Sequence, residues 1–338
     1  MKIAVFNTKS YDKQFITEAN EKYHHELAFF EVHLNYETCQ LAFGFEGICC
    51  FVNDELNKEV LTLLSQKGLR LVVLRCAGFN NVDIQTAAAL GITVARVPAY
   101  SPHGVAEHAV TMMLALNRKI YRSYNRIREG NFSLDGLLGF EMYGKTAGII
   151  GTGKIGALTA KILSGFGIKI LAYDVTANPE LESTGATYAG LNELYAQSDI
   201  ISLHLPLTHD THHIINDKSV SQMKNGVMLI NTSRGGLINT QSVIDGLKSG
   251  KIAYLGLDVY EEEGDLFFED LSGHVIQDDV FSRLLTFPNV MITGHQAFFT
   301  NTALKNISET TLKNISDFEN NTIEPANLVK IELVKNDK

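Results

Sequence analysis

The sequence lacks the features that mark several classes of protein. Its 338 residues include only 6 prolines and 27 glycines, too few for a collagen-like or a low-complexity chain. It has no excess of basic residues, because 29 Lys and Arg against 38 Asp and Glu leave a net charge of −9. Such a charge balance disfavours nucleic acid and anionic membranes as partners. Its apolar runs are far shorter than the ~18 residues of a membrane span, and no signal-peptide pattern precedes the first strand. We therefore expect a cytoplasmic protein with a small-molecule substrate.

Cysteine is also scarce, and its spacing is uninformative. The four cysteines, at positions 39, 49, 50 and 76, form no C-x-x-C pair and suggest neither a disulfide framework nor a zinc site. Cys49 and Cys50 stand next to each other in an apolar strand pattern, so their side chains point to opposite faces. We expect all four to be buried thiols that pack as small apolar residues.

Two series of alternating strand and helix patterns fill the chain. Strands of the first series are expected at residues 3–6, 27–33, 47–52, 69–74 and 93–97. After helical patterns at 105–118 and 119–128, six more strands are expected at 146–150, 168–173, 200–204, 227–231, 253–259 and 290–293. Such alternation predicts an α/β protein with parallel sheets covered by helices, the second series being typical of a doubly wound nucleotide-binding fold. The apolar pattern after residue 300 predicts a helix that returns to the first series.

A glycine motif opens the second series. The segment between strand 146–150 and the next helix reads Gly151-Thr152-Gly153-Lys154-Ile155-Gly156, which is G-x-G-x-x-G in a strand–turn–helix context. Asp174 ends the following strand, close to the ~20-residue spacing of the acid that binds the adenosine ribose. A carboxylate there repels a 2′-phosphate, so NAD is favoured over NADP. Gly148 to Lys154 also spells most of a P-loop, but Ile155 stands where a magnesium-binding Ser or Thr is needed.

Three polar residues follow strands of the second series, namely Arg234, Glu263 and His295. Ligands bind beyond the carboxyl ends of the strands in such sheets. Arginine matches a carboxylate with a planar fork, histidine delivers a proton to a developing alkoxide, and a neighbouring carboxylate keeps that histidine charged. The three residues together predict reduction of a 2-keto acid by hydride transfer.

A histidine-rich segment offers a competing interpretation. It contains five residues of metal-ligand type, His204, His209, Asp210, His212 and His213. Their spacing matches no standard metal site. We expect a solvated loop and no metal.

Several motifs in this order resemble the D-specific 2-hydroxyacid dehydrogenase family, and within it the NAD-dependent fermentative D-lactate dehydrogenases. The resemblance rests on the glycine motif together with 231–235 (NTSRG), 256–261 (GLDVYE), 294–298 (GHQAF), 75–83 (RCAGFNNVD) and 97–102 (VPAYSP). It implies two Rossmann-like or flavodoxin-like domains with the active site in the cleft between them. The substrate (catalytic) domain would be discontinuous, residues 1–100 plus 300–338, and the NAD-binding Rossmann domain would span 101–299.

The resemblance also implies roles for individual residues. Arg234 would bind the substrate carboxylate, His295 would donate the proton, and Glu263 would pair with His295. Other substrate contacts would come from the amides of Ala77 and Gly78, the Tyr100 hydroxyl, and the rings of Phe51 and Phe298 over the substrate methyl. Besides the glycine motif, the cofactor residues would be Asp174, His204, Pro206, Thr232 and Asp258.

The implied activity is reversible hydride transfer between NADH and pyruvate, which gives D-lactate, in a homodimer or a tetramer. The apolar stripe of helix 105–118 fits either the interface or ordinary core. Two alternatives remain: a dehydrogenase for another small 2-keto acid, and a non-catalytic NAD(H)-sensing protein similar to transcriptional corepressors, since one fold serves many functions.

Overall fold

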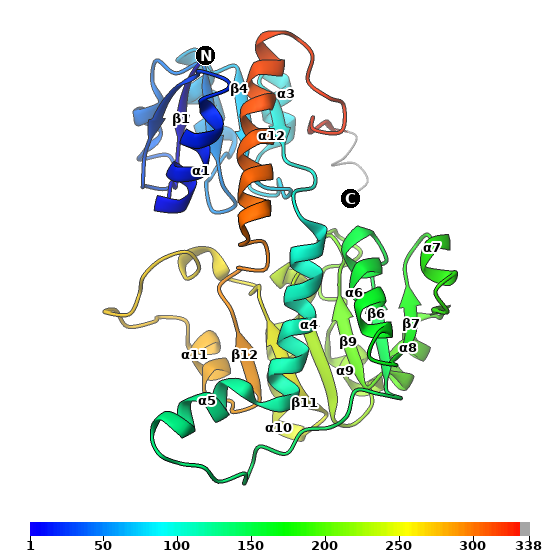
Figure 1. Cartoon of the computed structure of the whole chain (residues 1–338). Helices are drawn as coiled ribbons and strands as arrows, with labels where there is room; N and C mark the ends of the chain where they lie inside the picture. The colour runs from blue at the N-terminus through cyan, green and yellow to red at the C-terminus, as the bar shows by residue number, and fades with distance from the viewer. Residues whose placement is uncertain (332–338) are drawn as a thin grey trace. The chain divides into compact units, whose positions relative to one another are not determined.

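The computed structural model describes residues 1–331, which form two compact units (Figure 1). One unit comprises Met1–Ser101 together with the chain from Phe299, and the other comprises Pro102–Phe298. Within residues 1–331 no helix is both long and apolar enough to cross a membrane.

The first unit is built on a five-stranded parallel sheet, with the order β2-β1-β3-β4-β5 among the described residues. Its strands are β1 (Lys2–Val5), β2 (Glu26–Phe29), β3 (Gly47–Cys50), β4 (Leu71–Leu74) and β5 (Thr93–Arg96). β3 and β4 are buried along their whole length, as expected of central parallel strands covered on both faces. The helices are α1 (Ser10–Asn20), η1 (Cys39–Ala42), α2 (Lys58–Gln66), α3 (Ile84–Ala89) and α12 (Asn301–Glu319).

Helix α12 lies against the sheet of the first unit, although it comes from the other end of the chain (Figure 1). Its residues Leu312 and Ile315 share an apolar core with Ile3 and Val73 of the sheet. The Asn314 amide donates to the carbonyl oxygen of Arg96 at 3.0 Å. The first unit is therefore assembled from two distant parts of the sequence.

The second unit contains a seven-stranded parallel sheet, with the order β12-β11-β10-β9-β6-β7-β8 among the described residues. Its strands are β6 (Thr146–Ile150), β7 (Lys169–Tyr173), β8 (Thr187–Tyr188), β9 (Ile200–Leu203), β10 (Val227–Asn231), β11 (Ile252–Leu257) and β12 (Val290–Ile292). Its helices are α4 (Pro102–Arg118), α5 (Ile120–Arg128), α6 (Lys154–Ser164), α7 (Pro179–Glu182), α8 (Leu191–Gln197), α9 (Asp217–Gln222), η2 (Gly235–Leu237), α10 (Thr240–Ser249), η3 (Glu263–Asp265) and α11 (Asp279–Leu285). These two sheets confirm the expected parallel α/β fold class.

The sequence predicted six strands here, and the count was wrong by one. The missed strand, β8, has two residues and, within residues 1–331, pairs only with β7. A strand of that length shows no periodicity for a sequence pattern to detect.

Helix α4 carries the apolar stripe that fitted either core or interface. Its residues Val105, Ala109, Met112, Met113 and Leu116 are all buried, and the last four belong to a core cluster of the second unit. The stripe is therefore core.

All four cysteines are buried and free, which confirms the prediction that they pack as buried thiols. Burial raises the pKa of the Cys49 thiol to about 11.

Candidate active site

The glycine motif forms the tight turn between β6 and α6. Gly151 has a left-handed φ of 93°, and a side chain at Gly156 would overlap the carbonyl oxygen of Gly151. At Gly153, the N-cap residue just before α6, an added Cβ would meet no atom within 4 Å. The turn thus leaves open space at the amino end of an 11-residue helix, where backbone N–H groups attract a pyrophosphate.

Asp174 follows β7 and is held against this turn. One carboxylate oxygen, Oδ2, accepts from the Thr152 amide at 2.5 Å and from the Thr152 hydroxyl at 3.1 Å. The other, Oδ1, lies 3.4 Å from the Thr176 amide and has capacity left to accept from ribose hydroxyls. Tyr188 and Asn178, which sequence reasoning missed, complete the arrangement by donating to the Thr152 hydroxyl and carbonyl at 2.7 and 3.0 Å.

Two buried polar atoms near the ends of β9 and β10 have no hydrogen-bond partner within residues 1–331: His204 Nδ1 and Thr232 Oγ1. Buried polar atoms are normally paired, so such exceptions call for an explanation. A dinucleotide bound along this edge of the sheet would explain both unpaired atoms, because it carries hydrogen-bond donors and acceptors. Pro206, the next predicted residue along this segment, accepts from the Thr211 hydroxyl at 2.7 Å through its carbonyl. The residues present therefore fit NAD.

His204 should give the fold a pH dependence. Its Nε2 lies 2.9 Å from the Ser202 hydroxyl, and burial lowers its pKa from 6.5 to about 4. Between those pH values the unfolded chain binds this proton and the folded chain does not, so stability falls as the pH falls through that range. We expect the melting temperature of the wild type to drop more than that of a His204→Asn variant between pH 7 and pH 5. Equal drops would show that His204 does not contribute.

The three candidate catalytic residues follow β10, β11 and β12, which are neighbours in the sheet. His295 Nδ1 lies 2.8 Å from Glu263 Oε1, and the other oxygen of Glu263 accepts from the Tyr260 amide at 3.0 Å. Because Nδ1 faces the carboxylate, Nε2 is the ring atom left to face a substrate. Arg234 follows β10, and its guanidinium donates to the Ser233 carbonyl at 2.7 Å.

Asp258 organises the segment that carries His295. Its carboxylate accepts from the amides of Gln296 and Ala297, both at 2.9 Å, and from the Thr293 hydroxyl. Its carbonyl accepts from the His295 amide at 2.7 Å. Burial alone would raise the pKa of Asp258, but hydrogen bonds from His108 and Thr293 outweigh it and lower that pKa. The charged carboxylate is thus a fixed support for the backbone of His295, which has a left-handed φ of 50°.

His108 is part of this support, and sequence reasoning assigned it no partner. It projects from α4 and places Nε2 at 3.2 Å from the Thr293 hydroxyl and 3.3 Å from Asp258. A histidine in the middle of a helix gave no signal of such a contact.

The predicted substrate residues of the first unit follow β3, β4 and β5. The Arg75 guanidinium lies 4.8 Å from the centroid of the Phe51 ring. The carbonyl of Ala77 accepts from Arg96 at 2.8 Å, and that of Gly78 accepts from the Cys76 thiol at 3.3 Å. The Tyr100 carbonyl accepts from Asn306 at 2.6 Å. Phe298, in the second unit, is buried with 8% of its surface exposed.

Residues 110–297 match the family model described as "D-isomer specific 2-hydroxyacid dehydrogenase, NAD binding domain". The chain belongs to the D-isomer specific 2-hydroxyacid dehydrogenase family. It is 53% identical to the D-lactate dehydrogenase of Escherichia coli (strain K12), over 97% of this chain and 100% of the relative. It is 56% identical to a 2-hydroxyacid dehydrogenase homolog of Haemophilus influenzae, over 93% and 95% of the two chains.

Solved structures agree with this assignment. The apo-structure of D-lactate dehydrogenase from E. coli matches with a TM-score of 0.89 and 50% identity, over 97% of this chain and 100% of that one. The D-lactate dehydrogenase from Aquifex aeolicus, complexed with NAD and lactic acid, matches with a TM-score of 0.87 and 35% identity, over 97% and 99%. The predicted family, cofactor and enzyme class are confirmed, and the chain is an NAD-dependent oxidoreductase.

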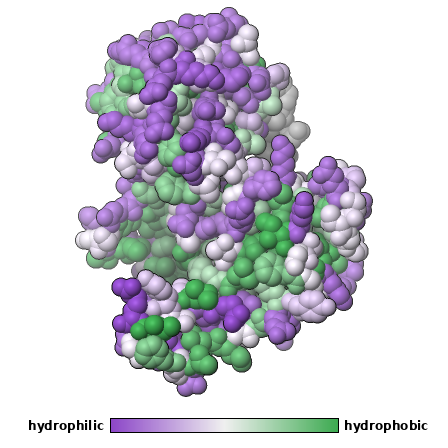
Figure 2. All heavy atoms as spheres, in the orientation of Figure 1, coloured by the Kyte–Doolittle hydropathy of each residue, from purple (hydrophilic) through white to green (hydrophobic). Residues whose placement is uncertain are grey.

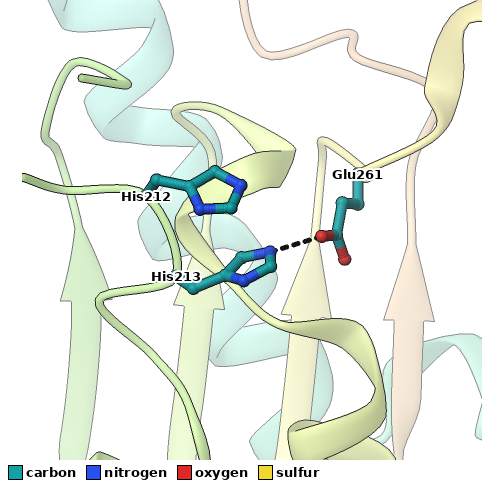
Figure 3. Close-up of side chains that lie close together, drawn as sticks. All are labelled: His212, His213 and Glu261. Carbon is teal, nitrogen blue, oxygen red and sulfur yellow. Dashed lines mark hydrogen bonds and ion pairs between the residues drawn. The ribbon is translucent and has the colours of Figure 1, made fainter. Parts of the chain in front are cut away.

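The histidine-rich segment of this dehydrogenase is not the uniform solvated loop that the sequence suggested. His204 is held by Ser202, and His209 is exposed beside Asp210. His213 instead bonds to Glu261 from the segment after β11, and His212 stacks on His213 (Figure 3). Burial would raise the pKa of Glu261, but bonds from His213 and Thr240 lower it.

Proposed function

We propose that this chain is a D-lactate dehydrogenase that transfers hydride reversibly between NADH and pyruvate. The observation that carries the proposal is the His295–Glu263 contact of 2.8 Å, at the same sheet edge as Arg234. The E. coli relative bears the name D-lactate dehydrogenase and is covered over its whole length, which supports the same substrate here.

Each catalytic residue has one task in this proposal. Arg234 binds the carboxylate of pyruvate through two parallel hydrogen bonds. NAD, when bound, supplies or accepts the hydride. His295 donates a proton from Nε2 to the carbonyl oxygen as negative charge develops there. Glu263 accepts from Nδ1 and stabilises the charged imidazole.

Substrate size is proposed to depend on Phe51 and Phe298, whose rings would lie over the methyl group of pyruvate. We expect Phe51→Leu to raise activity on a branched 2-keto acid relative to pyruvate, because a smaller side chain leaves room for a longer substrate. The change in the ratio of kcat/KM values should be about 10-fold, as one or two methylene groups in a pocket are worth roughly 1–3 kcal/mol. An unchanged ratio would remove Phe51 from the pocket.

The experiment that tests the activity is NADH oxidation with pyruvate beside glyoxylate, hydroxypyruvate and a branched 2-keto acid, followed by chiral analysis of the product. Rapid turnover of pyruvate to D-lactate is the expected result. A preference for another keto acid would keep the roles of His295, Glu263 and Arg234 and overturn the substrate. NADH binding without turnover of any acid would favour the NAD(H)-sensing alternative.

We further propose that the enzyme is a homodimer formed through α5 and the segment that follows it. α5 has no buried residue, and Figure 2 shows apolar atoms gathered over it at the lower edge of the view. Large apolar residues from here to residue 143 are exposed: Ile120, Tyr124, Ile127, Phe132, Leu134, Leu138 and Tyr143. Contiguous exposed apolar side chains mark interfaces, and a second copy offers a matching surface in a twofold arrangement.

Light scattering after gel filtration tests the dimer. We expect a dimeric mass for the wild type and a monomeric mass for a Tyr124→Lys/Leu138→Lys variant, because buried unpaired charges disfavour association. Tyr36→Lys is the matched control, since Tyr36 is similarly exposed in the other unit, at 59% against 61% for Tyr124. A dimeric mass for the double variant would place the interface elsewhere.

A further inference from the structure

Three ligand-type side chains that the proposed catalysis does not use lie together in the second unit. His212 and His213 come from the segment after β9, and Glu261 comes from the segment after β11 (Figure 3). One ligand atom from each lies within 4.8 Å of the others. We propose that His212, His213 and Glu261 bind one divalent transition-metal ion, with Zn²⁺ as the best match.

Glu261 is already oriented for this role. Its Oε2 accepts from the Thr240 hydroxyl at 2.8 Å and from the Thr240 amide at 3.2 Å. Its Oε1 faces His213 Nε2. Hydrogen bonds to the outer oxygen of a ligating carboxylate fix its direction and strengthen metal binding. The carboxylate is thus held from behind by the start of α10, with its other oxygen directed at the histidines.

The backbone of His213 is also held in place by hydrogen bonds. Its backbone has a left-handed φ of 51°, its amide donates to the Gly236 carbonyl at 2.9 Å, and its carbonyl accepts from the Asn216 side chain at 2.8 Å. The hydrogen bond between its Nε2 and Glu261 is the contact that an ion replaces. A ring nitrogen that binds a metal carries no proton, so the neutral His213 ring then carries its N–H on Nδ1 while Nε2 and the Glu261 carboxylate bind the ion.

The donor set selects the class of ion. Two imidazole nitrogens and one carboxylate oxygen form the His₂Glu set found in zinc proteins, with water in the fourth position. Mg²⁺ and Ca²⁺ prefer oxygen ligands throughout, so they match this set poorly.

One side chain must move for the ion to bind. The rings of His212 and His213 are stacked with centroids 3.7 Å apart and planes 29° apart. Two imidazoles on one tetrahedral ion diverge from it, so the stack must open. His212 is exposed, and its ring can turn about its own side-chain bonds while His213 and Glu261 stay in place. The ion then links the segments after β9 and β11 and stabilises the unit without entering the chemistry at His295.

Calorimetric titration of ZnCl₂ into the chelator-treated full chain tests the site. We expect one ion per chain, and binding at least about 10-fold weaker in His212→Phe, which keeps a stacking ring but has no ligand atom. His212→Gln is the second variant. His209→Phe is the control in the same segment, because His209 is exposed and pairs with Asp210, and it should bind as the wild type does. MgCl₂ should give no comparable binding.

A second readout is independent of both turnover and calorimetry. Zn²⁺ should raise the melting temperature of the wild type and leave that of His212→Phe nearly unchanged, because only an ion held by the folded state stabilises it. Unchanged Zn²⁺ affinity in both His212 variants would overturn the proposal. So would loss of binding in His295→Asn with retention in His212→Phe, since the ion would then sit on the catalytic pair.

Discussion

Replacement of His295 by asparagine is expected to lower kcat for pyruvate reduction by roughly 10²- to 10⁴-fold, the usual contribution of a positioned proton donor. Asparagine is the informative substitution because it tolerates the left-handed φ of 50° at this position. The backbone support from Asp258 is therefore retained while the titratable donor is lost. Steady-state kinetics at saturating pyruvate measure the effect.

NADH binding provides the control for this variant. A variant that retains full turnover would show that His295 is not the donor. NADH binding should be unchanged in the variant, which separates loss of chemistry from loss of fold.

Arg234→Lys should lower kcat/KM for pyruvate by about 10- to 100-fold. Lysine keeps the positive charge but cannot form the two parallel hydrogen bonds of a guanidinium, and a hydrogen bond to a charged group is worth roughly 1.5–3 kcal/mol. Local structure should survive, because the Arg234 guanidinium makes a hydrogen bond only to the adjacent Ser233 carbonyl among the described contacts. Most of the loss should appear in KM if the arginine acts mainly on binding.

The matched control is Arg283→Lys, an arginine of α11 that donates to the Thr286 hydroxyl. It makes the same replacement of a guanidinium by an ammonium group, and it should leave the pyruvate kinetics unchanged. Wild-type turnover and pyruvate affinity in Arg234→Lys would remove Arg234 from the substrate site.

Residues that follow strands were predictable from sequence because parallel strands fix where their ends meet. Arg234, Glu263 and His295 stand after β10, β11 and β12, and those strands are adjacent in the sheet. Their common edge follows from the strand order of a doubly wound fold. The Gly151–Gly156 turn was predictable for a similar reason, since its spacing is local and its glycines have steric causes.

Contacts between distant segments were not predictable. Glu261 contacts His213 because of the lengths and paths of the two loops that carry them. No rule of residue spacing predicts such a contact. His108 reaches Asp258 from a helix more than a hundred residues earlier in the chain. A histidine on a buried helix face gives the same pattern whether it contacts a carboxylate or an apolar side chain.

The way α12 completes the first unit sets an order for folding during synthesis. The second unit is continuous, Pro102–Phe298, so it can fold as soon as it leaves the ribosome. The apolar face of the first sheet, which includes Ile3 and Val73, must wait for Leu312 and Ile315. Ile16 of α1 packs on this face, but the part under α12 stays uncovered while about two hundred further residues are translated, at roughly 5–20 residues per second. The newborn chain therefore passes through a stage of tens of seconds in which chaperones have an apolar surface to bind.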